Sequence, residues 1–166
     1  MEINPKYKQL ITYAVIQDKT TNKLLLYKRL SGSGESRLVN KTSIGVGGHA
    51  NPVLAEELAE GQELPKTFDE LMAENFNREL HEELNIQGDV EVELLGFVND
   101  DENEVGEVHV GVIYLVKVES EANVSVNETD TLEIQFVTFD ELQADDKLEA
   151  WSKLLRDSEE IKEKIE

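Results

Sequence analysis

Three glutamates, Glu79, Glu82 and Glu83, lie close together near the middle of the sequence. Because each residue of an α-helix turns the side chain by about 100°, positions i, i+3 and i+4 fall within an arc of roughly 100° on one face. Like charges at this spacing destabilise an isolated helix by about 0.2–0.5 kcal/mol per pair. A hard divalent cation would offset that repulsion, so the spacing predicts a carboxylate site for Mg²⁺, with Mn²⁺ as an alternative.

An exposed acidic helix is the competing interpretation, and charge alone favours it. The chain has 36 acidic and 16 basic residues, for a net charge of −20. The order of residues around the glutamates is more specific than their charge. Glu70 is followed, after seven residues, by the run RELHEELNI at positions 78–86.

The glutamates fall within the longest helix that the sequence predicts, ELPKTFDELMAENFNRELHEELNI at positions 63–86. Thr67 and Glu70 have the spacing of a capping box at its start. Asn85 is a residue type that accepts the left-handed conformation often found after the last helical turn. Phe76, Leu80 and Leu84 recur at spacing four beside the glutamate arc and predict an apolar strip that packs on a sheet.

The rest of the chain alternates between apolar strand patterns and helical patterns. A hairpin is predicted at 9–18 and 23–30, further strands at 89–98, 107–118 and 132–139, a short helix at 52–61 and a helical region from about residue 140. This order predicts an α/β (α+β) fold in which a mixed sheet lies between helices. In the terminal region we expect Trp151 to pack in the core with Leu148, Leu154 and Leu155, and the last charged residues to fray.

Composition limits the classes of protein that need to be considered. A chain of 166 residues is long enough for one core, so we expect a single domain over 1–166. The absence of cysteine excludes disulfides, thiolate metal sites and a cysteine nucleophile. The strong negative charge disfavours an extended nucleic-acid interface or an anionic membrane surface. No apolar stretch has the length of a membrane span or of a signal peptide core, so we expect a soluble, cytoplasmic protein.

The glutamate run resembles the signature of the Nudix hydrolase family, which includes the MutT-like phosphohydrolases. The family pattern is Gly, five residues, Glu, seven residues, then Arg-Glu-apolar-any-Glu-Glu-any-Gly-apolar. From Glu70 onwards this chain matches it except that Asn85 stands in place of the second glycine. The resemblance extends to ITYAVIQDKTTNKLLLYKR as the opening hairpin, SIGVGGH as the strand and turn before the helix, and FVTFDEL as the last strand.

The first glycine of the pattern is displaced. Leu64 stands six residues before Glu70, and the equivalent glycines are Gly47 and Gly48, farther towards the N-terminus. We interpret the segment at about 50–66 as an insertion in the loop that leads into the helix.

The resemblance implies divalent-metal-dependent hydrolysis of a pyrophosphate bond in a small nucleoside diphosphate derivative. Carried over residue by residue, it gives the metal ligands as Glu79, Glu82, Glu83 and the backbone carbonyl of Gly48. It gives the catalytic residues as Glu82 and Glu83, with Arg78 and Glu70 in support. Arg78 is placed to pair with Glu70 or Glu74 along the helix and so hold the cluster in register.

Substrate-binding candidates come from elsewhere in the chain. Arg29, next to Lys28 at the end of the second strand, and His49, directly after the paired glycines, are placed to contact phosphate or substrate. His81 should be exposed, and His109 a structural histidine. The general base is left open among carboxylates that include Glu104, Glu107 and Glu133. The oligomeric state is also left open, and a homodimer is among the states allowed.

Two other activities are compatible with this fold. An enzyme like isopentenyl diphosphate isomerase would have similar glycine and glutamate motifs, but in its familiar form that chemistry needs a cysteine, which this chain lacks. A non-catalytic Nudix module that senses a ligand is the second alternative. The complete set of mutually repelling carboxylates argues against it, because a module without catalysis has no need of them.

Overall fold

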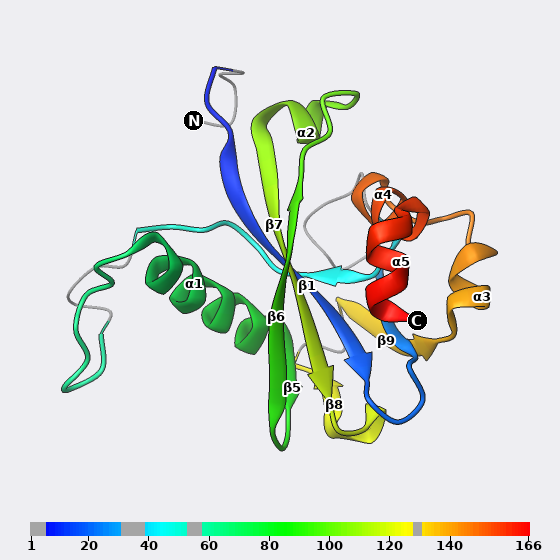
Figure 1. The fold of residues 1–166 in the computed structure, drawn as a ribbon, viewed down its shortest axis with the longest axis horizontal. Coiled ribbons are helices and arrows are strands. Elements are labelled where there is room, and N and C mark those ends of the chain that lie inside the picture. Colours follow the sequence, from blue (N-terminus) through cyan, green and yellow to red (C-terminus); the bar gives the residue numbers. More distant parts are fainter. Residues whose placement is uncertain (1–5, 31–38, 53–57, 128–130) are drawn as a thin grey trace.

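The computed structural model of the chain describes residues 6–30, 39–52, 58–127 and 131–166. Within these residues the main sheet has seven strands: β1 (Gln9–Asp18), β2 (Leu24–Arg29), β3 (Thr42–Ser43), β4 (Gly45–Val46), β6 (Val90–Val98), β7 (His109–Val118) and β9 (Leu132–Val137). They lie in the order β3-β2-β1-β7-β6, with β4 paired to β1 and β9 paired to β2 (Figure 1). Since β1 and β7 run parallel and the other pairs antiparallel, the sheet is mixed, as predicted.

The remaining elements connect or cover this sheet. They are α1 (Phe68–Glu83), β5 (Leu84–Ile86), α2 (Glu104–Val108), the 3₁₀-helix η3 (Glu121–Asn123), β8 (Val124–Val126), α3 (Phe139–Gln143), α4 (Ala150–Asp157) and α5 (Glu159–Ile165). Strands β5 and β8 pair with each other in a small second sheet. None of the helices in the described ranges is long and apolar enough to cross a membrane.

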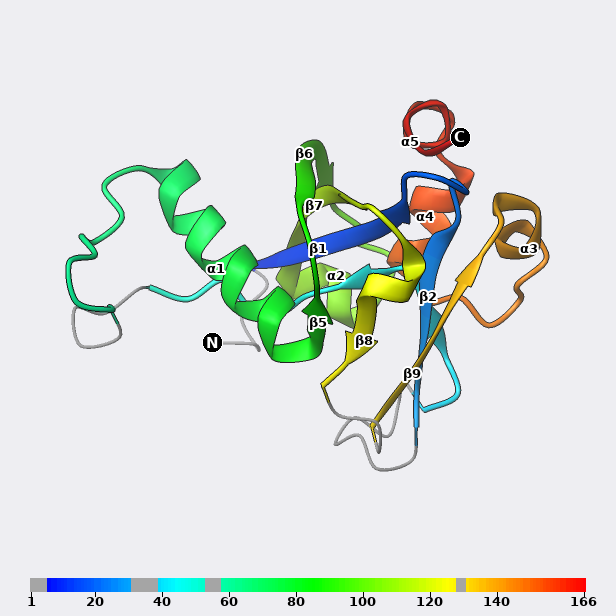
Figure 2. The same ribbon diagram turned by 90° about the horizontal axis from the view of Figure 1, so that it is seen from below.

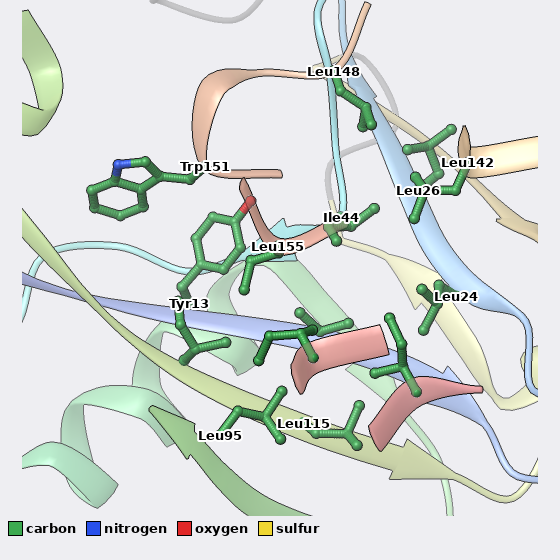
Figure 3. Packing of buried hydrophobic residues seen from close by; sticks show 14 of the residues in the cluster. Tyr13, Leu24, Leu26, Ile44, Leu95, Leu115, Leu142, Leu148, Trp151 and Leu155 are labelled. Atoms are coloured by element: carbon green, nitrogen blue, oxygen red, sulfur yellow. The ribbon is translucent and has the colours of Figure 1, made fainter. Parts of the chain in front are cut away.

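Helices cover both faces of the main sheet (Figure 2). On one face, Phe76 and Leu80 of α1 pack on β1, β4 and β7 in a cluster that includes Val116. On the other face, residues of α3, α4 and α5 pack in a second cluster around β1 and β7 (Figure 3). The layered arrangement confirms the predicted fold class. It places the glutamate-bearing helix on the opposite side of the sheet from the C-terminal helices.

The second cluster contains a polar connection between the sheet and α4. The Tyr13 hydroxyl on β1 contacts Ser152 Oγ at 2.7 Å and donates to Glu149 Oε1 at 2.8 Å. Burial raises the pKa of Tyr13, so the group stays a neutral phenol. Trp151 packs edge-on against the Tyr13 ring, which confirms its predicted place in the core. Leu154 was expected there too, but it is exposed on the outer side of α4.

Helix α1 forms where the sequence predicts it. Thr67 caps it by accepting a hydrogen bond from the Glu70 backbone N–H at 3.2 Å, and the predicted strip of Phe76, Leu80 and Leu84 is buried. The reciprocal half of the capping box is shifted by one residue, because the Glu70 carboxylate accepts from Lys66 N rather than from Thr67 N.

The end of α1 differs from the prediction. Asn85 is not left-handed, because the chain passes directly from the helix into β5, where Asn85 pairs with Ser125. Strand pairing therefore ends the helix. At the C-terminus the predicted helical region is divided into three helices, and its last turn is packed rather than frayed, with Ile165 buried. Half of the short helix predicted at 52–61 lies outside the described residues, and 58–61 are not helical.

Asp18, at the end of β1, anchors the connections at one end of the sheet. Its Oδ1 accepts hydrogen bonds from Thr20 N and Oγ1, both at 2.7 Å, and from Thr21 N at 3.1 Å, while Oδ2 accepts from Glu121 N at 2.8 Å. Burial by itself would raise the pKa of Asp18, but the hydrogen bonds outweigh it and lower the pKa to about 2. The carboxylate is therefore held in its charged form.

This environment predicts a specific acid sensitivity. Since the folded pKa of about 2 lies below the unfolded value of about 3.9, Asp18 stabilises the fold above pH 4 and this contribution is lost as the pH falls towards 2. We expect Asp18→Asn to flatten that part of the pH profile. It should also lower the free energy of unfolding at neutral pH by about 1–3 kcal/mol, because an amide N–H would face the Glu121 N–H. Urea unfolding between pH 2 and 7 measures both effects. Asp146→Asn, at an exposed position, is the control. Equal pH profiles for the two variants would contradict the stabilising role of the Asp18 carboxylate.

Candidate active site

Glu79 lies in a space that only a glycine leaves open. The segment that follows β4 continues along β1, held by hydrogen bonds from Thr12 N to Gly48 O and from Ala50 N to Leu10 O, each 2.9 Å. A Cβ placed on Gly48 would lie 2.2 Å from Glu79 Oε2, so the carboxylate packs directly against the glycine backbone. The Glu79 side chain is only 15% exposed. Helix α1 and the paired-glycine segment thus meet at this carboxylate.

Arg78 joins the same two segments from the side. Its Nη2 donates to Glu79 Oε1 at 2.9 Å and to the backbone carbonyl of His49 at 3.1 Å. Its Nε lies 3.8 Å from Glu82 Oε1. The predicted pairing of Arg78 with Glu70 or Glu74 is therefore wrong: the guanidinium reaches across to the glycine segment instead of back along the helix. It still holds two of the three glutamates in register.

Asn75 is buried one turn before Arg78 and completes the connection. Its Oδ1 accepts from Asn51 N at 2.8 Å and from Arg78 Nη2 at 2.9 Å, while its Nδ2 donates to Asn51 O at 2.8 Å and to Leu71 O at 2.9 Å. These bonds use the full capacity of the amide. Asn75 therefore fixes the start of the inserted segment to α1 and orients the arginine.

The other two glutamates lie on the last turn of α1. The Glu82 side chain is 61% exposed, and the Glu83 side chain borders a small pocket between α1 and the main sheet. Asn127, which follows β8, supports this turn: its Nδ2 donates to His81 O at 2.7 Å and to Glu82 O at 3.2 Å, and its backbone N–H donates to Glu83 O at 3.1 Å. Carbonyls that a helix end leaves without partners are thereby satisfied.

The donor set suits a hard dication. Three carboxylates on one helical face, one of them in a cradle that a Cβ would fill, are the oxygen ligands that Mg²⁺ and Mn²⁺ prefer. In the described part of the chain, however, no three His, Asp or Glu side chains converge as a finished metal site. Glu79 and Glu82 are turned towards Arg78. Binding of an ion would therefore require these two carboxylates to rotate.

A small pocket, with an accessible volume of about 10 Å³, lies beside Glu83, between the end of α1 and strands β2, β4 and β9. Its apolar walls are Val46, Leu84, Leu132 and Ile134. Tyr27 and Arg29 supply its polar side, together with Glu83. The Arg29 guanidinium carbon lies 5.5 Å from the centre of the Tyr27 ring, and its Nη2 donates to the Tyr27 hydroxyl at 3.3 Å. Burial, followed by the nearby Glu149 carboxylate, raises the pKa of Tyr27 to about 12.

Arg29 therefore lies beside the glutamate helix, on the same pocket as Glu83. Lys28 is the neighbouring residue of a strand, so its side chain points to the other face of the sheet. The Glu133 side chain also points to the other face of the sheet, away from the pocket, because Leu132 and Ile134 on either side of it line the pocket. It lies opposite Lys28 in the register of β2 and β9. This orientation argues against Glu133 as a general base.

The remaining predicted site residues lie apart from the pocket. His49 Nε2 is 3.2 Å from His109 Nε2, and His109 Nδ1 donates to Val105 O at 2.7 Å. The two histidines thus join the glycine segment to the start of β7. Glu104 and Glu107 are exposed on α2, next to His109.

Three further predictions concern single groups. Glu70 caps the start of α1 through Lys66 N. The Gly48 carbonyl accepts from Thr12 N at 2.9 Å and from Thr12 Oγ1 at 3.3 Å, so a metal ion would have to share an oxygen that is already engaged. His81 is exposed, as predicted, and its Nδ1 donates to Asn77 O at 2.6 Å.

The comparisons with known proteins agree with this geometry. The family model for the NUDIX domain matches residues 8–157. The chain belongs to the Nudix family. It is 39% identical over 161 residues to protein YmaB of Bacillus subtilis, a match that covers 94% of this chain and 73% of that protein.

Solved structures show the same fold. The putative Nudix hydrolase Tm1382 is 30% identical, with a TM-score of 0.69 over 92% of this chain and 70% of that one. The NUDIX domain of NrtR from Shewanella oneidensis, solved with ADP-ribose, is 19% identical, with a TM-score of 0.63 over 98% of this chain and 94% of that one. At that identity the second match shows the fold alone. As a Nudix family member, this chain is a hydrolase that acts on phosphoric anhydrides.

The sequence patterns did not identify two residues at the site. Tyr27 lies two positions before Arg29, and residues i and i+2 of a strand share a face, so the strand prediction contained the signal for it. Asn75 is three positions before Arg78, a spacing at which helical side chains meet. In the sequence, the one sign that Asn75 is buried is its position next to the apolar Phe76.

The Asn75 bonds predict a measurable contribution to stability and to the position of Arg78. Asn75→Ala leaves the Asn51 backbone groups without their partners, so we expect the free energy of unfolding to fall by about 1–3 kcal/mol and hydrolysis to fall as well. Chemical denaturation and kcat/KM measure the two effects. Asn77→Ala, on the exposed side of the same helix, is the control. A stable, fully active Asn75→Ala protein would contradict the described role.

The close approach of the Glu79 carboxylate to Gly48 gives a second prediction. In Gly48→Ala the new Cβ would meet the flexible end of Glu79, which can move aside, so the melting temperature should change little while hydrolysis falls about tenfold or more. Gly61→Ala is the opposite control: a Cβ there meets nothing within 4 Å, but the φ of +88° is strained for alanine. That variant should lose stability and keep its activity. Full activity in Gly48→Ala would show that hydrolysis does not depend on the close approach of Glu79 to Gly48.

Proposed function

We propose that this chain hydrolyses a pyrophosphate bond in a nucleoside diphosphate derivative, with Mg²⁺ or Mn²⁺ held by Glu79, Glu82 and Glu83. The observation that carries the proposal is the position of Glu79 against Gly48, with Arg78 bonded to both segments. A structural helix has no need to bring a carboxylate so close to a glycine backbone. The pattern of glutamates supports the same conclusion.

The bound cation would supply charge neutralisation on the pyrophosphate and would lower the pKa of the attacking water. The protein groups would do the rest. Arg29, beside Glu83, is placed to bind a phosphate group in an otherwise acidic protein. Arg78 would keep Glu79 and Glu82 oriented, with Glu70 supporting the start of the helix.

His49 would have a less direct role in the reaction. Its side chain contacts His109 and does not line the pocket with Arg29 and Glu83. Its backbone carbonyl, in contrast, accepts from Arg78. We therefore assign His49 to holding the site together, and contact with the substrate would require a substrate that extends past Gly48.

A substrate panel tests the proposed reaction. Purified protein is incubated with ADP-ribose, nucleoside diphosphate sugars, dinucleoside polyphosphates and nucleoside triphosphates, with Mg²⁺, with Mn²⁺ or with EDTA. ADP-ribose is included because it is bound by the NrtR domain of the same fold. We expect release of phosphate-bearing products from at least one class, and only with metal. Binding of a member of the panel by calorimetry, without turnover, would support a ligand-sensing module instead.

The matched variants are Glu83→Gln and Glu74→Gln, which make the same change on the same helix. Glu83→Gln should lower kcat by orders of magnitude, whereas Glu74→Gln, outside the glutamate arc, should keep the activity of the wild type. Mg²⁺ should raise the melting temperature of the wild-type protein, and Glu79→Gln should abolish that rise, because an ion that binds the folded state stabilises it. Equal activity in the two glutamine variants would contradict the assigned ligands.

A further inference from the structure

Strand β6 lies at the end of the main sheet, beside β7 (Figure 2), and it leaves apolar side chains in solvent. Within the described residues it pairs with β7 alone, so its other edge is a row of unpaired backbone groups. Val90, Val92, Leu94 and Phe97 are 41%, 49%, 52% and 63% exposed. Edges of this kind attract another strand unless they are protected by charge, proline or a cover. We call these four residues the β6 stripe.

The β6 stripe continues the core that α1 covers. Val92 lies opposite Val116 on β7, and Leu94 lies opposite Tyr114. The two β7 residues belong to the cluster beneath α1. A bulge at Gly96 brings Phe97 back to this face, opposite Val112. Because α1 packs mainly on β1 and β4, the stripe is left uncovered. It amounts to an apolar area on the order of a few hundred Å².

The charged residues of β6 are already neutralised within the chain. Glu91 lies 2.6 Å from Lys19 Nζ, and Glu93 lies 3.0 Å from Lys164 Nζ. The protein has a net charge of −20, so two copies repel each other over most of their surface. On this strand each carboxylate has its own ammonium group. These two glutamates therefore oppose the approach of a second copy less than unpaired carboxylates would.

The first five residues of the strand form a symmetric pattern. Residues 90–94 read VEVEL, with apolar and glutamate positions repeating on either side of Val92. If two such strands pair antiparallel with Val92 on the two-fold axis, Val90 lies opposite Leu94 of the second copy. Glu91 then lies opposite Glu93 of the second copy, and the ion pair of each glutamate offsets the repulsion between them. Such a self-complementary surface is what a two-fold interface requires.

We propose that the β6 edge is the interface of a symmetric homodimer, in which β6 pairs antiparallel with β6 of a second copy about Val92. The pairing joins two sheets into one and places Val90, Val92 and Leu94 of the two copies side by side, whereas Phe97 lies opposite Gln87 of the second copy. A typical stable interface buries about 800 Å² on each partner, more than the stripe supplies, so the dimer should dissociate at low protein concentration. The proposal is independent of the hydrolytic reaction.

The absence of native cysteine allows a direct test by crosslinking. Directly opposed antiparallel residues have Cα atoms about 4.5–5.5 Å apart, within the range of about 4.4–6.8 Å that a disulfide accepts. Val92→Cys should therefore form a covalent dimer under mild oxidation. Leu154→Cys, 46% exposed on α4, is the matched control and should remain monomeric on a denaturing gel.

The register is tested by a mixture of variants. Val90→Cys and Leu94→Cys should each crosslink poorly alone and efficiently when mixed, because each position faces the other one across the axis. Efficient crosslinking of Val90→Cys with itself would contradict the register. Equal crosslinking of the β6 and α4 cysteines would overturn the interface.

Sedimentation velocity tests the unmodified protein. The wild type should shift from monomer to dimer as its concentration rises, and Val92→Lys should remain monomeric at concentrations where the wild type is a dimer. This variant lowers the net negative charge, so general repulsion cannot explain its dissociation; Leu154→Lys makes the same charge change and should still dimerise. A wild type that stays monomeric at all concentrations would overturn the proposal and leave the edge to another extended chain.

Discussion

The site depends on one set of hydrogen bonds, which the Arg78 guanidinium makes between α1 and the segment that follows β4. It donates to the His49 carbonyl, to the Asn75 amide and to the Glu79 carboxylate. The apolar contacts of the buried strip fix the distance of the helix from the sheet but are not directional, and the bonds of Asn75 to Asn51 tie the helix to the same segment one turn earlier. The arginine supplies the direction and sets the rotation and height at which Glu79 reaches Gly48.

The rest of the fold can be understood as support for that contact. Strand β1 lies near the centre of the sheet and holds the glycine segment through Thr12 and Leu10. Strand β2, its neighbour, carries Arg29 to the pocket at the end of α1. The two-stranded sheet of β5 and β8 brings Asn127 to the last turn of α1. A protein with net charge −20 thereby keeps an arginine beside one of its acidic clusters.

The sequence predicted those features that follow from periodicity. Spacing of four identified the buried strip of α1, and alternation identified the strands of the sheet. It did not predict the end of the helix, because Asn85 has a local preference that pairing with β8 overrides. It also gave the wrong partners for Arg78, since spacing along a helix reports neighbours on that helix and not the His49 carbonyl, which is distant in sequence. Asn75 was missed for the same reason: both groups of its Asn51 partner lie on another segment.

The most direct test of the central claim is a crystal structure of the protein with Mn²⁺ and a non-hydrolysable nucleoside diphosphate analogue, measured with anomalous scattering. We expect an anomalous peak within about 2.0–2.3 Å of carboxylate oxygens of Glu79 and Glu83, with Arg78 still bonded to the His49 carbonyl. Phosphate oxygens of the analogue should lie on the open side of the ion, towards Arg29. A fully occupied analogue with no anomalous peak at these glutamates, or a peak held by other residues, would contradict it.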